Sequence, residues 1–302
     1  LEVVAPYATV SLREPLMIPF RQWREVNETA LDLTADLAAQ PFVEGLAGQV
    51  EGGVVVRRRD AGAASTASAS DAADGDTGAL TRLPYVRFEL VADALGYGEI
   101  AIDRASLQGE FDYPQVRLSQ TEATFPDGSR ATLSADLDLA TRTLADFSGE
   151  ATINPTTAAE LTGGAVSLER LSARFAASGP LDDIRHDGAV EIREVTTAGL
   201  APLAVTVNWA GEQRGLAQLL DGSADAIAFT LDELTAEAQS ADLGLQVGAD
   251  FRLEGQEVTL GLSTLAVTLG DSPPLGLTQP ARLRVGFDGA LRSEERRVGK
   301  EC

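Results

Sequence analysis

Apolar and polar residues alternate with a period of two along most of the chain after residue 81. The clearest stretch is 242–253, where Leu243, Leu245, Val247, Phe251 and Leu253 are separated by polar residues and glycines. Alternation over that length places every apolar side chain on one face of a β-strand. Similar stretches occur at 130–139, 203–209, 227–231, 258–262 and 281–287.

Turn signals separate these stretches. They are Asp127-Gly128, Gly163-Gly164, Asp187-Gly188, Asp221-Gly222, Gly255 and Pro273-Pro274. Such pairs between alternating runs are typical of hairpins, which join antiparallel strands. The sequence therefore predicts an all-β protein, a long antiparallel meander curved into an elongated groove or an incomplete barrel.

Three local features refine this prediction. Residues 155–161, which follow Asn154, and 213–220 are predicted to form short helical turns. The alternation also slips by one residue between Leu168 and Leu171, which predicts a β-bulge or a strand break.

The chain divides into four predicted segments. An N-terminal β segment (1–60) precedes a flexible low-complexity loop of small residues (61–80), and the repeating body covers 81–291. Residues 1–60 are short for a stable domain, which favours an insertion within one sheet over a linker between domains. Residues 292–302 contain the only Lys and the only Cys, and this break in composition predicts a non-native tail.

Composition excludes several kinds of function. A formal net charge of -22 argues against binding nucleic acid and against electrostatic docking on anionic lipid, since both need clustered Lys and Arg. No apolar run is long enough for a transmembrane helix. The chain begins with Leu rather than Met, which favours a fragment. A membrane anchor or an export signal would then lie outside it.

The apolar face of one-sided strands must be covered, and a barrel, a sandwich or a groove would each cover it. An outer-membrane barrel needs aromatic girdles, and only 5% of the residues are aromatic. The choice between a groove and an ordinary filled core stays open, because both use the same alternation.

Two stretches, 175–193 and 251–262, resemble the AsmA-like superfamily in the style of its TamB- and YdbH-type members. There, a strand, a glycine-containing turn and a second strand repeat with a polar outside and an aliphatic inside. The resemblance covers about residues 85–290 and is one of pattern, without an invariant motif.

The resemblance implies a periplasmic β-groove, anchored in the inner membrane, that carries phospholipid acyl chains towards the outer membrane. It also implies a link to an outer-membrane assembly protein as a partner. The residues expected to line the groove are Leu133, Leu137, Leu139, Leu203, Val205, Val207, Leu243, Leu245, Val247, Phe251, Leu253, Leu260 and Leu262.

Catalytic signatures are absent from the sequence. There is no nucleophile elbow, phosphate-binding loop or zinc motif, so we expect no enzymatic activity, no cofactor and no metal. Asp182, Asp183, His186 and Asp187 are predicted to form a solvated turn rather than a metal site. Asp136 and Asp138 are assigned to the solvent face of a strand.

Two functions follow. The first is a lipid-conducting or assembly-related envelope protein, and the alternative is a β-sandwich or solenoid module of a surface adhesin. A glycan-binding module would display exposed aromatic residues, whereas Trp209 is in phase with the apolar residues of its strand. This observation favours the first function.

Overall fold

The computed structural model of the chain describes most of its length. The described residues are 2–5, 7–13, 28–39, 45–58, 83–98, 100–196, 201–216, 228–254, 257–286 and 291–293. They form two compact units, unit 1 over Leu1–Phe147 and unit 2 over Ser148–Cys302.

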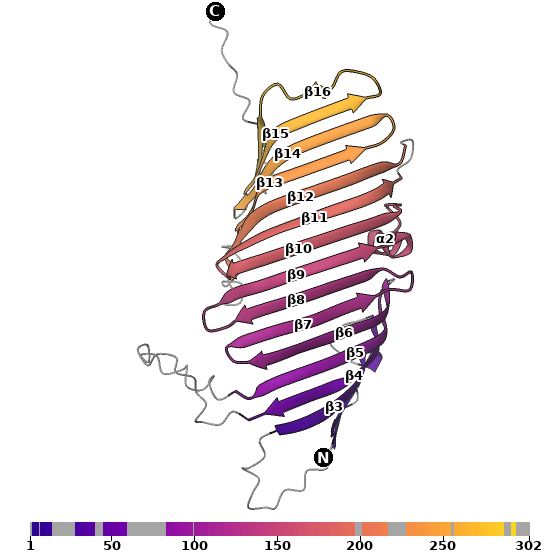
Figure 1. The fold of residues 1–302 in the computed structure, drawn as a ribbon, viewed down its shortest axis with the longest axis vertical. Helices are drawn as coiled ribbons and strands as arrows, with labels where there is room; N and C mark the ends of the chain where they lie inside the picture. The colour runs from indigo at the N-terminus through magenta and orange to yellow at the C-terminus, as the bar shows by residue number, and fades with distance from the viewer. Residues whose placement is uncertain are drawn as a thin grey trace, which may run out of the picture. The chain divides into compact units, whose positions relative to one another are not determined.

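Unit 1 is a succession of strands in which each pairs antiparallel with the next along the chain, from β1 to β8 (Figure 1). The strands are β1 (Glu2–Ala5), β2 (Ala8–Leu12), β3 (Glu28–Asp36), β4 (Leu46–Arg57), β5 (Tyr85–Tyr97), β6 (Ile100–Asp112), β7 (Gln115–Thr124) and β8 (Arg130–Asp138). A short 3-10 turn, η2 (Leu37–Ala39), follows β3, and β9 (Thr143–Ile153) crosses the boundary between the units.

Unit 2 repeats this plan. Antiparallel pairing runs from β10 to β15 and continues to β17 and β18. Its elements are α2 (Pro155–Thr162), β10 (Arg170–Pro180), β11 (Asp183–Val195), β12 (Leu203–Arg214), β13 (Ala228–Gln239), β14 (Leu243–Glu254), β15 (Glu257–Leu269), β16 (Leu275–Gly276), β17 (Ala281–Gly286) and β18 (Leu291–Ser293). The predicted all-β antiparallel meander is confirmed.

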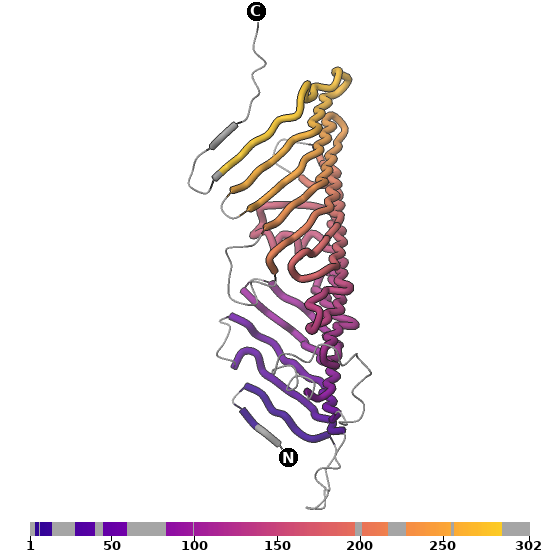
Figure 2. The backbone as a smooth tube through the Cα atoms, turned by 90° about the vertical axis from the view of Figure 1, so that its left-hand side faces the viewer, coloured from indigo at the N-terminus to yellow at the C-terminus, as the bar shows by residue number. Residues whose placement is uncertain are grey.

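Three of the register shifts in unit 2 lie beside one another, while a fourth, at Ile192/Val195 between β11 and β12, lies apart from them. The register shifts at Ala210/Gly211 between β12 and β13, at Leu231/Leu234 between β13 and β14, and at Gly248/Ala249 between β14 and β15. These shifts are neighbours across the sheet because Gly211 pairs with Leu231 and Leu234 pairs with Ala249. A bulge bends its strand, so adjacent strands bend at one level, and Figure 2 shows the strands of each unit changing direction along their length.

The predicted helical turns and the predicted phase slip can be compared with the structure. The helical turn after Asn154 is confirmed as α2, which ends at Gly163 in the left-handed region (φ 61°). The phase slip is a strand break, since β10 begins at Arg170 and Ser167 forms only an isolated bridge with Thr196. Of the second predicted helical turn (213–220), Gln213 and Arg214 belong to β12, Leu216 is helical, and 217–220 lie outside the described residues.

Among the predicted turns, Asp127-Gly128 separates β7 from β8, and Gly163-Gly164 follows α2. Pro273-Pro274 precedes β16, while Asp221-Gly222 and Gly255 lie outside the described residues. The hairpin predicted at Asp187-Gly188 is wrong, because both residues lie inside β11. Gly188 has a packing role instead, since a side chain there would run into the indole ring of Trp209 on β12.

The low-complexity segment predicted at 61–80 falls between β4 and β5. β4 and β5 pair residue by residue although residues 58–84 separate them in the chain, so one sheet continues across this connection. The loop 61–80 lies outside the described residues. Of the tail 292–302, the structure describes only Arg292 and Ser293, at the end of β18.

Candidate functional site

The pairing register sorts the side chains of each unit onto two faces. We call the face of unit 2 that carries Leu245 and Val247 its apolar face, and the face of unit 1 that carries Leu133 and Leu137 the apolar face of that unit. In each unit the opposite face is the charged face. Aliphatic residues continue from strand to strand across the apolar face: Val207 pairs with Ala236, Ala236 with Val247, and Val247 with Leu265. The result is a sheet surface with unbroken apolar rows.

All but one of the predicted lining residues lie on such a face. In unit 2 these are Leu203, Val205, Val207, Leu243, Leu245, Val247, Phe251, Leu253, Leu260 and Leu262, on β12, β14 and β15. In unit 1, Leu133 pairs with Thr121 and Leu137 with Val116, on β7 and β8.

Leu139 is the exception. It follows the end of β8, is 38% exposed, and its backbone N–H donates to the carbonyl oxygen of Pro114 at 2.8 Å. The predicted alternation runs one position past the end of the strand. Asp138 already begins the turn, because it accepts hydrogen bonds from the backbone N–H groups of Ala140 and Thr141.

The apolar faces are only partly covered. Every predicted lining residue on them is half-buried, and none is among the hydrophobic side chains that the structure buries. Those buried side chains, among the described residues, are mostly alanines: Ala92, Ile153, Ala158, Leu168, Ala177, Leu181, Ile184, Ala189 and Ala249. A filled sandwich core would instead bury its large aliphatic residues almost completely.

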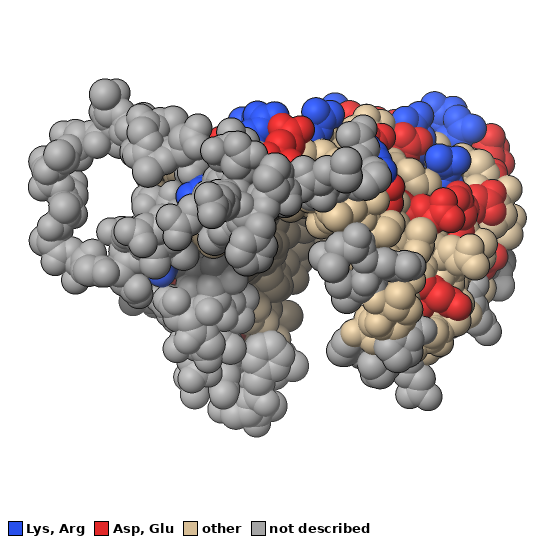
Figure 3. Space-filling view, turned by 90° about the horizontal axis from the view of Figure 1, so that it is seen from below, with Lys and Arg blue, Asp and Glu red and all other residues tan. Residues whose placement is uncertain are grey.

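The charged face of unit 1 carries ion pairs between neighbouring strands. Arg117 contacts Glu110 at 2.8 Å and Asp136 at 3.1 Å, and Arg57 contacts Glu28 at 2.7 Å. Figure 3 shows charged side chains gathered along the upper and right-hand surface in the view from below. Asp136 lies on this charged face, as predicted.

A stack of rings crosses the apolar face of unit 2. The His186 ring centroid lies 5.1 Å from that of Phe229, with the planes at 8°, and 6.1 Å from that of Phe175. Phe229 in turn meets the edge of Phe251 at 6.2 Å. His186 on β11 reaches Phe229 on β13 because the residue opposite it on β12 is Gly211, which has no side chain.

The sequence predicts that His186 lies in a solvated turn, and that prediction is wrong, because His186 lies inside β11. It is only 6% exposed, and neither ring nitrogen has a hydrogen-bond partner. Burial lowers the pKa of the imidazole, while the charges of Asp187 and Asp232 raise it by less. The ring is thus held neutral at pH 7.

The sequence carried a signal for this placement. The sequence alternates Ile184, His186, Gly188, Val190 and Ile192 with Arg185, Asp187, Ala189 and Glu191, straight through the Asp-Gly pair that predicts a hairpin. This unbroken period of two outweighs the local turn propensity of Asp-Gly, because a strand position on an apolar face is fixed by all of its neighbours.

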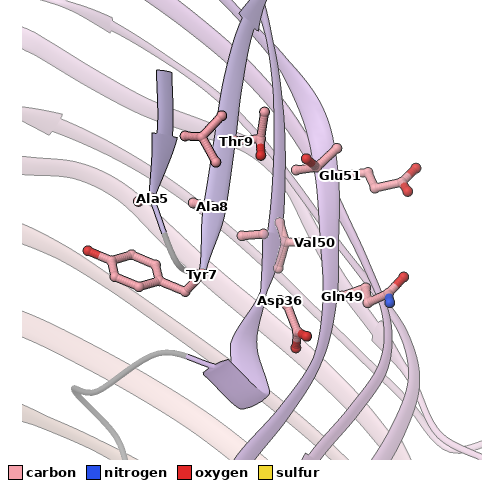
Figure 4. Close-up of a pocket in the computed structure, with 11 residues that line it drawn as sticks. Ala5, Tyr7, Ala8, Thr9, Asp36, Gln49, Val50 and Glu51 are labelled. Atoms are coloured by element: carbon pink, nitrogen blue, oxygen red, sulfur yellow. The ribbon is translucent and has the colours of Figure 1, made fainter. Parts of the chain in front are cut away.

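Two hollows in unit 1 differ in character from the apolar faces. One, of about 400 Å³, lies across β1–β4 and combines Ala5, Ala8 and Val50 with Asp36 and Gln49 (Figure 4). The other, of about 670 Å³, has a strongly charged lining drawn from the strands β3–β6 and residue 13. Neither contains a predicted lining residue.

Within the described residues, no group of three or more His, Cys, Asp or Glu side chains is arranged to hold a metal ion. No helix in the same part of the chain is long and apolar enough to cross a membrane. Compared with protein-family models, curated proteins and solved structures, the chain has no match.

Proposed function

We propose that the apolar faces bind the acyl chains of lipids. The observation that carries this proposal is the half-buried state of the aliphatic rows on β12–β15 and on β7–β8. Covering such a surface lowers the free energy by roughly 25 cal/mol per Å² of apolar area removed from water. An acyl chain is a suitable cover, since it has no polar groups to satisfy.

The chemistry of the face suits transport better than tight recognition. Apolar burial has no direction, so a chain of methylene groups can shift along aliphatic rows with little change in free energy. The strands also have the required length, because β14 has 12 residues and ten residues in a strand span about 33 Å. These features support a conduit for lipid rather than a catalytic centre.

The cellular setting follows from the resemblance to AsmA-like proteins. In this proposal the chain is the periplasmic part of an envelope protein, anchored in the inner membrane by a segment outside this sequence. It carries phospholipid towards the outer membrane or assists outer-membrane assembly together with a partner protein. It acts without a cofactor.

The adhesin alternative receives less support from these contacts. A sandwich module buries the apolar faces of two sheets against each other. Here the large aliphatic residues of the apolar faces are half-buried, and Trp209 lies against Gly188 rather than standing clear of the surface as a sugar platform.

The test compares two adjacent residues of β12 that point to opposite faces. Val207→Asp places a charge on the apolar face, whereas Asn208→Asp places the same charge on the opposite face, between Ala189 and Thr235. Native mass spectrometry of protein purified from a Gram-negative host measures bound phospholipid. We expect equal lipid on the wild type and on Asn208→Asp, and clearly less on Val207→Asp.

A second variant keeps the face apolar. Ala236→Trp adds a large ring between Val207 and Val247 and should reduce the number of bound acyl chains without adding charge. Lipid-free wild-type protein, or equal lipid on Val207→Asp and Asn208→Asp, would refute the proposed function.

A further inference from the structure

The apolar face of unit 2 has one polar location. At paired positions outside the bulges, the strands β10–β15 place on this face only aliphatic residues, glycines and aromatic rings, apart from His186 and Gln213. These two are diagonal neighbours, because His186 pairs with Gly211 and Gln213 is two residues further along the same strand. Two polar groups are thus brought together in a surface that is otherwise apolar.

His186 has unused hydrogen-bonding capacity. A neutral imidazole has one N–H donor and one acceptor nitrogen, and burying both without partners is unfavourable. Both nitrogens of His186 lack a partner, although the side chain is more than nine-tenths buried. Sequences normally avoid such a group, so its presence in the middle of a binding face points to a ligand.

We propose that His186, with Gln213 beside it, hydrogen-bonds the uncharged polar junction of an acyl lipid, which is an ester carbonyl or a hydroxyl group. This inference rests on the proposed function, because the acyl chain then occupies the aliphatic rows of β14 and β15. The junction carries an oxygen that accepts from the imidazole N–H, and a hydroxyl also donates to the other nitrogen.

An ionised headgroup fits this place poorly. The rings of Phe175 and Phe229 stack on the imidazole, and no Lys or Arg occupies a paired position on this face of β10–β15. A phosphate or carboxylate brought here would lose its hydration without gaining an opposite charge. The site therefore selects the neutral part of a lipid and leaves charged groups in water.

Access depends on one ring. Both nitrogens of His186 are covered, and Phe229 is the closest of its stacked partners. The phenyl ring of Phe229 turns aside when the lipid oxygen reaches the imidazole.

His186 is the only histidine of the chain, which makes the test direct. Protein labelled with ¹⁵N-histidine gives the ring nitrogens of His186 without background in NMR spectra. The probes are methyl laurate, which has an ester carbonyl, and tridecane, which has a similar length and no polar group. We expect methyl laurate to shift the ring resonances and to favour one tautomer, and tridecane to change neither.

His186→Phe is the matched variant, because it keeps a ring in the stack and removes both nitrogens. One lost hydrogen bond should weaken methyl laurate binding about tenfold, while tridecane binding changes less than about twofold. Circular dichroism checks that His186→Phe folds. If this variant does not fold, the NMR response of the labelled wild type still tests whether His186 contacts the ester.

The outcomes separate the two proposals. If neither probe binds the wild type, the proposed function fails and this inference fails with it. If both probes bind but the His186 resonances stay fixed and His186→Phe binds the ester normally, only this inference fails. A response to ionised laurate without one to methyl laurate would overturn the selection of a neutral junction.

Discussion

The charged face of unit 1 and the apolar face of unit 2 are built in opposite ways. The charged face of unit 1 places Arg117 between two carboxylates, and its ion pairs are exposed to solvent, where they contribute little to stability. The apolar face of unit 2 has rows of aliphatic side chains, a ring stack and glycines at close contacts. Stability and ligand binding should therefore depend on the apolar face, and solubility on the charged one.

Gly211→Ala should have the largest effect on stability. A Cβ at this position would collide with the backbone carbonyl oxygen of Thr230 on β13, which cannot move without disturbing the bulge. We expect the free energy of unfolding to fall by about 3 kcal/mol, measured by urea titration.

Gly244→Ala on β14 is the control for that experiment. It lies on the opposite face, and its added Cβ would have ordinary contact with Thr268 at 3.6 Å. Its effect should stay within about 0.5 kcal/mol. Equal losses in the two variants would show that glycine content, and not the contact below the ring stack, determines stability.

Asp138→Ala should cost less, because the interaction it removes is confined to one turn. The Oδ1 atom of Asp138 accepts from the backbone N–H groups of Ala140 (2.8 Å) and Thr141 (2.9 Å), and Oδ2 accepts from Gln115 (2.7 Å). We expect a loss of about 1 kcal/mol in thermal or urea unfolding at pH 7.

The pH dependence of Asp138→Ala provides its check. Hydrogen bonds from Thr141, Ala140 and Gln115 lower the pKa of Asp138, although burial opposes them. Its contribution is therefore complete above the unfolded-state pKa of about 3.9 and is lost as the pH falls below that value. The wild type and the variant should approach the same stability at low pH, and a constant difference would contradict this assignment.

His186 should give the apolar face a pH dependence of its own. Because burial lowers the folded-state pKa, the unfolded chain takes up a proton first as the pH falls below about 6.5. The stability of the wild type should therefore decrease from pH 7 to pH 5. His186→Phe should lose less over the same range in urea titrations, and parallel curves would indicate that the ring is already solvated.

Salt should have the smallest effect, and it should be favourable. Screening weakens the exposed ion pairs, but it also weakens the repulsion within a chain of net charge -22. We expect the thermal midpoint to rise by roughly 1–3 °C between about 0.05 M and 0.5 M NaCl. A clear fall would mean that the ion pairs of the charged face matter more than their exposure implies.

The sequence predicts the strands better than it predicts the site. A period of two assigns Val205, Val207 and Leu245 to one face, since alternation depends only on strand geometry. The close packing of Trp209 on Gly188 and the meeting of His186 with Phe229 depend on the register between strands. Register is a property of pairs of strands, and no single stretch of sequence contains it.

The pairing of β4 with β5 has a practical consequence for engineering. These strands form a continuous antiparallel ladder, apart from one bulge, although residues 58–84 separate them in the chain. The entropic cost of closing such a connection grows slowly, by about 0.6 kcal/mol for each doubling of its length. This position is therefore the natural place to insert a fluorescent domain or an affinity tag, with both ends leaving from neighbouring strands and the apolar rows of β7–β8 and β12–β15 left unaltered.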